Sequence, residues 1–284
     1  MRVAPEAPDP DPDAGTTAEL AISQLHNRLA TTNEDLRDQL PGIETERRVT
    51  DWGRSERVER LVDRTVCDFL YRYWFRVEVE GIENVPDQGG ALLVANRSRA
   101  ILTDGAMIAK AIKEEHRWPR PLYVSAERQI DALPGLGMLV TKLGGVAAHP
   151  ANLQRLLFDE RELVLAFPEG PGGGRKPINH RYRLQRFDDR DVGAAVHAEV
   201  PVIPVAVLGA EEAAPSIARV LPVAPLIPLP AKFKLRFLEP VAPDDAGPER
   251  SRDQSVRALT DEIRALIQEN LLEMVAERDS VWLG

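Results

Sequence analysis

Apolar and polar positions alternate along this chain with two different periods. Short apolar or alternating runs bounded by turn-forming residues are typical of strands, and apolar residues at steps of three and four are typical of amphipathic helices. The strands expected on this basis are residues 77–81, 91–95, 121–125, 144–147, 162–167, 202–208 and 232–237, the last of them at a sheet edge. The helices expected are residues 58–74, 104–115, 133–143, 152–159, 188–197 and 251–277.

This order of strands and helices predicts one α/β domain, a sandwich with a largely parallel central sheet flanked by helices. We assign it to residues 51–284, with the motif-bearing core at about 77–240. Residues 1–17 are rich in Pro and Asp, and we expect them to be disordered because they bury almost nothing. Residues 18–50 have loosely helical spacing and are expected to form a helical extension, which contacts a partner or membrane, packs on the domain or stays loosely ordered.

Two further segments carry apolar residues in an unusual setting. Residues 69–76 crowd aromatic side chains and arginines at the end of a helix, which suits either a membrane interface or a core helix packed on a sheet. Residues 221–230 are rich in Pro and Leu and can form neither a helix nor a central strand. They suit a lid, a membrane-dipping wall or a loop buried on the domain's own core. No apolar stretch approaches the ~20 residues that span a bilayer.

Composition and charge narrow the function classes. The formal net charge of −9 argues against a nucleic-acid partner, which requires a concentrated basic surface. A local basic patch can still face anionic lipid. The single cysteine, Cys67, excludes an internal disulfide and is expected to be a buried, inert thiol in a reducing cytoplasm. The sequence has no metal-ligand cluster, no P-loop or dinucleotide fingerprint and no G-x-S-x-G elbow, and nothing in it predicts an oligomeric state.

The polar loop after the strand 91–95 is the first candidate site. It holds Asn96, Arg97 and Ser98 and reaches Asp104, where a helical pattern begins. Ligands of open α/β sheets bind outside the carboxyl ends of strands, which favours a functional loop. The alternative is an ordinary loop in which Asp104 is only a helix N-cap.

A second candidate follows the strand 162–167. Phe167, Pro168, Glu169 and Gly170 lead into a glycine-rich stretch that contains Gly172 and ends in Arg175 and Lys176. Glycines let backbone amides approach an anion, and the two cations supply charge. The arginines of a second basic cluster follow at Arg181, Arg183 and Arg186. Together these residues suit a phosphate group, whereas the alternative is a solvated charged loop.

These motifs, in this order, resemble the glycerolipid acyltransferase family of lysophosphatidic acid acyltransferases and their relatives. That family has Asn-His, a spacer and Asp after an apolar strand, and Asn96, Arg97 and Asp104 stand in that place here. The longer spacer and the Gly105 after the Asp resemble the monoacylglycerol-acyltransferase-like branch. Further matches are the residues 144–146, 181–187 and 201–212, so the resemblance covers roughly residues 70–240.

The resemblance implies a glycerolipid-acyltransferase-like sandwich that moves a fatty acyl group to a hydroxyl of a glycerolipid or lysophospholipid. It implies a thioester co-substrate, acyl-CoA or acyl carrier protein, and no bound cofactor or metal. It also implies a lipid substrate and a peripheral position on the inner, cytoplasmic face of the cell membrane. The catalytic positions are Arg97, in place of the family histidine, with Asp104 and Glu169. The substrate-binding positions are Asn96, Ser98, Phe167, Pro168, Gly170, Gly172, Arg175, Lys176, Arg181 and Arg183.

Arg97 changes what this site is expected to do. A guanidinium stays protonated and offers no acceptor, so it cannot take a proton from an attacking hydroxyl. We expect Arg97 to form an ion pair with Asp104, which leaves the protein slow or inactive as an acyltransferase. The alternatives are a base relocated to His149 or His180, or Asp104 itself as a weaker base if burial raises its pKa. An inactive relative would instead bind lipid or acyl thioester, or regulate.

Overall fold

The computed structural model describes residues 49–98, 101–126, 135–170, 181–213, 228–243, 252–278 and 280. The chain divides into two units, residues 1–48 and residues 49–284. The predicted tail and nearly all of the predicted helical extension lie outside the described residues, as do residues 221–227 of the proline-rich segment. Everything below concerns the second unit.

Seven strands form a single sheet in the order β1-β7-β6-β2-β5-β3-β4. The strands are β1 (Glu78–Glu80), β2 (Ala91–Ala95), β3 (Leu122–Ala126), β4 (Gly145–Ala147), β5 (Leu163–Ala166), β6 (Val202–Leu208) and β7 (Lys234–Phe237). Every neighbouring pair is parallel except β6 and β7. The predicted, largely parallel sheet is therefore confirmed. The prediction that 232–237 lies at an edge is wrong, because β1 pairs with the outer side of β7 and is itself the edge strand.

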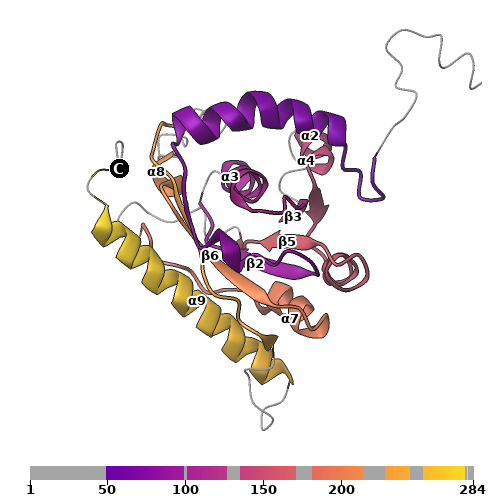
Figure 1. The fold of residues 1–284 in the computed structure, drawn as a ribbon. Coiled ribbons are helices and arrows are strands. Elements are labelled where there is room, and N and C mark those ends of the chain that lie inside the picture. Colours follow the sequence, from indigo (N-terminus) through magenta and orange to yellow (C-terminus); the bar gives the residue numbers. More distant parts are fainter. Residues whose placement is uncertain are drawn as a thin grey trace, which may run out of the picture. The chain divides into compact units, whose positions relative to one another are not determined.

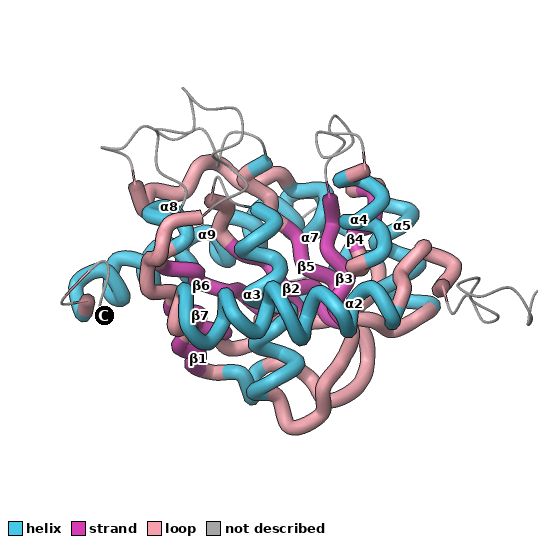
Figure 2. The backbone as a smooth tube through the Cα atoms, turned by 90° about the horizontal axis from the view of Figure 1, so that it is seen from above, coloured by secondary structure: helices cyan, strands magenta, loops and turns pink. Residues whose placement is uncertain are grey.

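Helices cover both faces of the sheet (Figures 1 and 2). They are α2 (Glu56–Val62), α3 (Ile101–Glu115), α4 (Leu136–Lys142), α5 (Pro150–Gln154), α7 (Asp189–His197), α8 (Ala210–Ala213) and α9 (Arg252–Glu277). π-helical turns continue α2 through Asp63–Cys67 and Leu70–Trp74 and continue α5 through Arg155–Asp159, and a 3-10 turn spans Ile82–Asn84. On one face α3 lies against the sheet and α2 crosses outside it, while α7 and α9 lie on the other face (Figure 1).

Helix α3 starts earlier than the sequence predicts. It begins at Ile101, so Asp104 lies within its first turn instead of at its N-cap. The simple capping role that was the alternative for Asp104 is therefore wrong.

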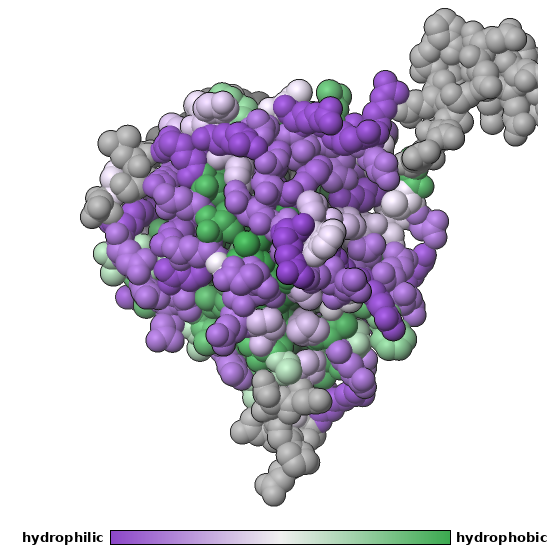
Figure 3. Space-filling view, viewed as in Figure 1, coloured by the Kyte–Doolittle hydropathy of each residue, from purple (hydrophilic) through white to green (hydrophobic). Residues whose placement is uncertain are grey.

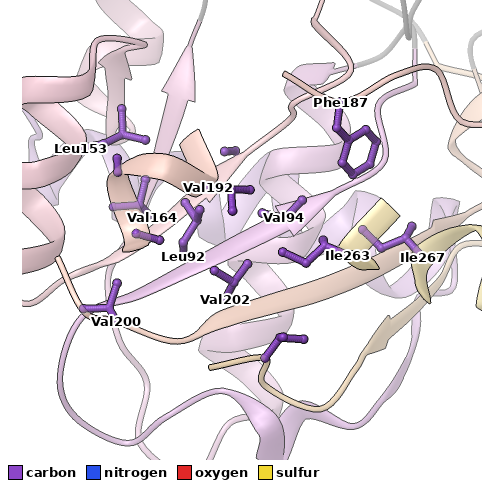
Figure 4. Packing of buried hydrophobic residues seen from close by; sticks show 14 of the residues in the cluster. Leu92, Val94, Leu153, Val164, Phe187, Val192, Val200, Val202, Ile263 and Ile267 are labelled. Carbon is purple, nitrogen blue, oxygen red and sulfur yellow. The ribbon is translucent and has the colours of Figure 1, made fainter. Parts of the chain in front are cut away.

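The sheet centre is buried on both faces. All residues of β2, β5 and β6 are buried, which explains why their sequences are continuous apolar runs instead of alternating ones. Leu92, Val94 and Val202 point from the sheet toward α7 and α9, where Val192 and Ile263 meet them (Figure 4). A second buried cluster fills the opposite face, around α3 and the helix that ends at Trp74.

The surface seen in Figure 3 is mainly hydrophilic, with hydrophobic side chains showing in a band through its centre. Among the described residues, no helix is both long enough and apolar enough to cross a membrane.

Candidate functional site

The candidate site forms where the carboxyl ends of β2 and β5 meet. The two strands are parallel neighbours, with Val94 opposite Ala166. The chain therefore leaves both strands at the same edge of the sheet, residues 96–98 after β2 and residues 167–170 after β5. Open α/β sheets bind their ligands at this edge. The two motifs identified separately in the sequence are thus brought together.

The Asn96 side chain links the end of β2 to the end of β6 by hydrogen bonds. Its Nδ2 donates to the Val207 carbonyl oxygen at 2.9 Å, and its Oδ1 accepts from the Val207 N–H at 2.7 Å. The side chain is buried, and one backbone unit occupies both polar ends of its amide. Asn96 therefore has a structural role in joining two strands, and its contact with a substrate stays a prediction.

Glu169 ties the two motif loops to a third segment. Its Oε1 accepts a hydrogen bond from the Arg97 N–H, and its Oε2 accepts one from the Gln185 N–H, both at 2.9 Å. The carboxylate is buried, where such charge-assisted bonds are strong. These bonds show that Glu169 supports the site, and a contact between Glu169 and the acceptor stays a prediction.

Asp104 is fully buried beside this loop. Its Oδ2 accepts a hydrogen bond from the Ser98 N–H at 3.0 Å, but no hydrogen-bond partner for Oδ1 is found in the described part of the chain. Burial raises the pKa of this carboxyl to about 7, against the opposing hydrogen bonds from Ser98. The charge of Glu211 raises the pKa further, and that of Arg97 lowers it.

The ion pair predicted between Arg97 and Asp104 stays a prediction: Oδ2 of Asp104 accepts from Ser98, and its Oδ1 has no hydrogen-bond partner among the described residues. Such a pair would lower the pKa of Asp104, whereas the pKa is raised because desolvation outweighs the lowering effect of the Arg97 charge. The condition set for Asp104 as a weaker base, a raised pKa caused by burial, is met.

A cavity of about 1160 Å³ opens at this edge of the sheet. Among the residues selected from the sequence, its lining contains Arg97, His149, Phe167, Pro168, Glu169, Gly170 and Arg186. Asp104 is described and fully buried but is not part of this lining. A ligand in the cavity therefore lies beside Arg97, whereas Asp104 is not part of the wall that it meets.

Other predicted residues lie elsewhere. Ser98 is buried against Asp104, and neither Arg181 nor Arg183, both described, is part of the cavity lining. The predicted positions Gly172, Arg175 and Lys176, and the alternative base His180, fall outside the described residues.

Sequence reasoning missed several lining residues. Ser125 lies at the carboxyl end of β3, a position that could have selected it once the strand order was known. Arg257 comes from α9, far along the chain, and no local motif marks it. Glu211, which raises the pKa of Asp104, follows β6 and was read only as part of a motif match.

His149 is held in one tautomer. Its Nδ1 accepts a hydrogen bond from the Ala151 N–H at 3.2 Å, which caps α5. In a neutral imidazole the proton then resides on Nε2, which becomes a donor. A general base requires an acceptor there, so this contact does not support the relocation of the base to His149.

Comparison with known proteins identifies the family. The family model described as "Acyltransferase" matches residues 76–208. A protein of Mycobacterium leprae, described as uncharacterized, is 34% identical over 94% of this chain and 78% of its own length. Proteins of Mycobacterium tuberculosis and Mycobacterium bovis, also described as uncharacterized, are 32% identical over 95% of this chain and 80% of their own length. The chain belongs to the acyltransferase family.

The fold of this acyltransferase family member is also that of a solved structure. The 1-acyl-sn-glycerophosphate acyltransferase PlsC from Thermotoga maritima matches with a TM-score of 0.55 and 22% identity, over 79% of this chain and 84% of that one. The family resemblance inferred from the motifs is confirmed, and so is the fold.

Proposed function

We propose that the cavity binds an acyl thioester, from acyl-CoA or acyl carrier protein, together with a hydroxyl-bearing glycerolipid or lysophospholipid. In acyl transfer the acceptor oxygen attacks the thioester carbonyl carbon, a C–O bond forms, the C–S bond breaks, and the hydroxyl proton passes by way of a base to the departing thiolate. The observation that carries the proposal is the position of Arg97, which follows β2 at the motif position and lines the cavity.

Arg97 limits this chemistry. It has five N–H donors and no acceptor, so it can orient or bind an oxygen but cannot take the hydroxyl proton. Loss of a general base costs a factor of about 10² to 10⁴. Acyl transfer by this chain is therefore expected to be absent or slower by at least ~10²-fold than a histidine at this position would allow.

The same residue favours a second candidate function. A relative without turnover that binds lipid or acyl thioester, or regulates, would retain the cavity and its loops but not the base. Glu169 still joins the two motif loops here, so the site's framework does not depend on the missing histidine.

The test separates binding from turnover. Octanoyl-CoA should bind the full chain in calorimetry, and Arg186→Ala, in the lining, should weaken it because the donor carries phosphates. Arg264→Ala on α9 serves as the matched control. Release of free thiol in the presence of lysolipid or monoacylglycerol then measures turnover. Absence of binding in the parent chain contradicts the proposal, and binding without thiol release favours the second function.

We extend the proposal to a peripheral membrane position on the inner face of the cell membrane. The exposed side of the helix from Glu56 to Trp74 carries Leu61, Val66, Phe69 and Tyr73 among arginines. Trp74, at its end, donates from Nε1 to the Pro228 carbonyl oxygen at 2.9 Å. This contact joins the aromatic helix end to the last residues of the proline-rich segment, the two stretches expected to face lipid.

A further inference from the structure

A short segment of the chain lies between α9 and the motif loops. We call residues 182–188 the strap. We infer that Gln268 and Arg278 of the C-terminal part of the chain are positioning residues for the candidate site, which act through the strap and Glu169 on Arg97. The inference about ligand binding rests on the proposed function, whereas the inference about positioning does not.

On the α9 side, one amide holds the strap at two points. Gln268 Nε2 donates to the Tyr182 carbonyl oxygen at 2.7 Å, and Gln268 Oε1 accepts from the Leu184 N–H at 2.8 Å. The two backbone groups belong to residues two apart, so the planar amide fixes the direction of the chain between them. Both partners are part-buried, where such bonds resist competition from water.

Tyr182 itself is held in an unfavourable backbone conformation. Its φ of 60° lies in the left-handed region, which costs a bulky residue free energy unless surrounding contacts determine it. Besides the bond from Gln268, its N–H donates to Glu211 Oε2 at 3.3 Å and its hydroxyl accepts from Arg278 Nη2 at 3.1 Å. The strap begins at a residue that three side chains hold, two from α9 and its C-terminal end and one from α8.

Arg278 binds more than the strap. Its Nη2 also lies 3.0 Å from Oε1 of the buried Glu212, next to Glu211 in the turn after β6. The guanidinium lies over the Tyr182 ring, 5.7 Å from its centroid. Arg278 therefore fixes the ring of Tyr182 and the turn that carries Glu211 relative to each other.

On the site side, the strap ends at the motif loops. Gln185 donates its N–H to Glu169 Oε2, and Asp188 donates its N–H to the Pro168 carbonyl oxygen, both at 2.9 Å. The other oxygen of Glu169 holds the Arg97 N–H. A continuous series of hydrogen bonds thus runs from α9 through the strap to the backbone of the residue that replaces the family histidine.

We expect the two ends of this series to be coupled. Releasing the strap from α9 should make local unfolding around Arg97 more frequent. Gln268→Met keeps the length of the side chain but removes both of its hydrogen bonds. We expect amide hydrogen exchange at Arg97 and Gln185 to become roughly tenfold faster, because two hydrogen bonds that hold the strap are lost.

Asn270→Leu is the matched control. Asn270 also lies on α9 and makes two hydrogen bonds, but to Leu266 of its own helix and to Arg236 of β7. It should leave the exchange of the Arg97 amide within about twofold of the parent. Gln268→Glu keeps the acceptor for Leu184 and loses the donor to Tyr182, so an intermediate rate of exchange at the Arg97 amide is expected. This variant replaces Gln268→Met if Gln268→Met does not fold.

The inference is overturned if Gln268→Met speeds amide exchange at Leu184 but leaves exchange at Arg97 unchanged. It is also overturned if Asn270→Leu speeds exchange at Arg97 as much as Gln268→Met does. Octanoyl-CoA affinity gives the functional readout, with about a fivefold loss expected for Gln268→Met and none for Asn270→Leu. If the parent chain does not bind octanoyl-CoA, the proposed function fails, while the exchange data still decide whether α9 positions Arg97. The two readouts can also disagree. If the Arg97 amide exchanges faster in Gln268→Met but octanoyl-CoA binds as tightly as it does to the parent, the claim that the position of Arg97 controls ligand affinity is contradicted.

Discussion

Helix α3 buries two charged side chains, and their surroundings differ. Lys110 is 3% exposed and its ammonium contacts three carboxylates, Glu114 at 2.8 Å, Asp63 at 3.2 Å and Asp68 at 3.4 Å. Burial lowers the pKa of Lys110, but hydrogen bonds and charges from Glu114 and Asp63 outweigh it, so the pKa is raised. The charged form of this lysine is therefore favoured by its neighbours.

Asp104, six residues earlier on the same helix, is fully buried; Ser98 donates to it, and its Oδ1 meets no hydrogen-bond partner in the described residues. Its pKa is raised to about 7, which means that its charged form is disfavoured. Lys110 serves to hold the helix that crosses α3. A buried group whose charge is poorly compensated is typical of functional sites, and Asp104 fits that description.

The largest expected effect is on stability at high pH. Because the folded-state pKa of about 7 lies above the ordinary value of 3.8, the folded protein binds a proton that the unfolded chain releases between these pH values. The contribution of this group to the free energy of unfolding is therefore present at low pH and is lost as the pH rises through 7. Asp104→Asn should be more stable than the parent by about 4 kcal/mol at pH 9 and no different at pH 3. Urea unfolding at both pH values measures this, and an equal difference at both would contradict the raised pKa.

A slightly smaller effect is expected at Lys110. Lys110→Met removes the buried cation that three carboxylates share and leaves them only their outer partners Arg72 and Lys113, which should destabilise the protein by about 3 kcal/mol. Lys113→Met is the matched control, since Lys113 lies on the same helix, is 36% exposed and pairs with Asp63 at 3.3 Å. Its loss should cost less than about 1 kcal/mol. Similar losses of unfolding free energy for both variants would remove the contrast between the two buried charges.

The fold could be predicted because its signals are local. The apolar runs of β2, β5 and β6 and the apolar spacing of α9 are fixed by burial, and each matches its predicted bounds within a few residues. The position of β7 could not be predicted, because pairing with the edge strand β1 depends on residues about 150 positions away.

Part of the site could also be predicted, because its motifs are local in the sequence. Two strand-end motifs identified Arg97 and Glu169, and their meeting follows from the register of β2 and β5. The sequence left the sign of the Asp104 pKa shift open, raised by burial or lowered by pairing with Arg97, because a sequence does not reveal how completely the carboxylate is buried; the pKa is raised. The bonds from Gln268 and Arg278 had no local signal at all.

The smallest expected effect concerns the outer face of the helix that Lys110 anchors. Its acidic residues Asp63 and Asp68 turn toward Lys110, which leaves Phe69 and Tyr73 exposed at 51% and 70%. Phe69→Ser with Tyr73→Ser should lower binding to anionic vesicles roughly tenfold. Trp118→Ser with Phe158→Ser removes two equally exposed aromatic residues elsewhere and should change it little. Equal losses in co-sedimentation would show that the helix face has no special part in membrane binding.

The central claim is that Arg97 alone removes the proton acceptor from an otherwise intact site. Release of free thiol from an acyl-CoA, with lysolipid or monoacylglycerol as the acceptor, tests it in the parent, Arg97→His and Arg97→His/Asp104→Asn chains. We expect Arg97→His to raise the rate at least ~10²-fold, and the added Asp104→Asn to remove that gain because the imidazole loses its orienting carboxylate. A parent chain that turns over rapidly and is inactivated by His149→Ala or His180→Ala would contradict the claim, and so would an Arg97→His variant that stays inactive on every acceptor.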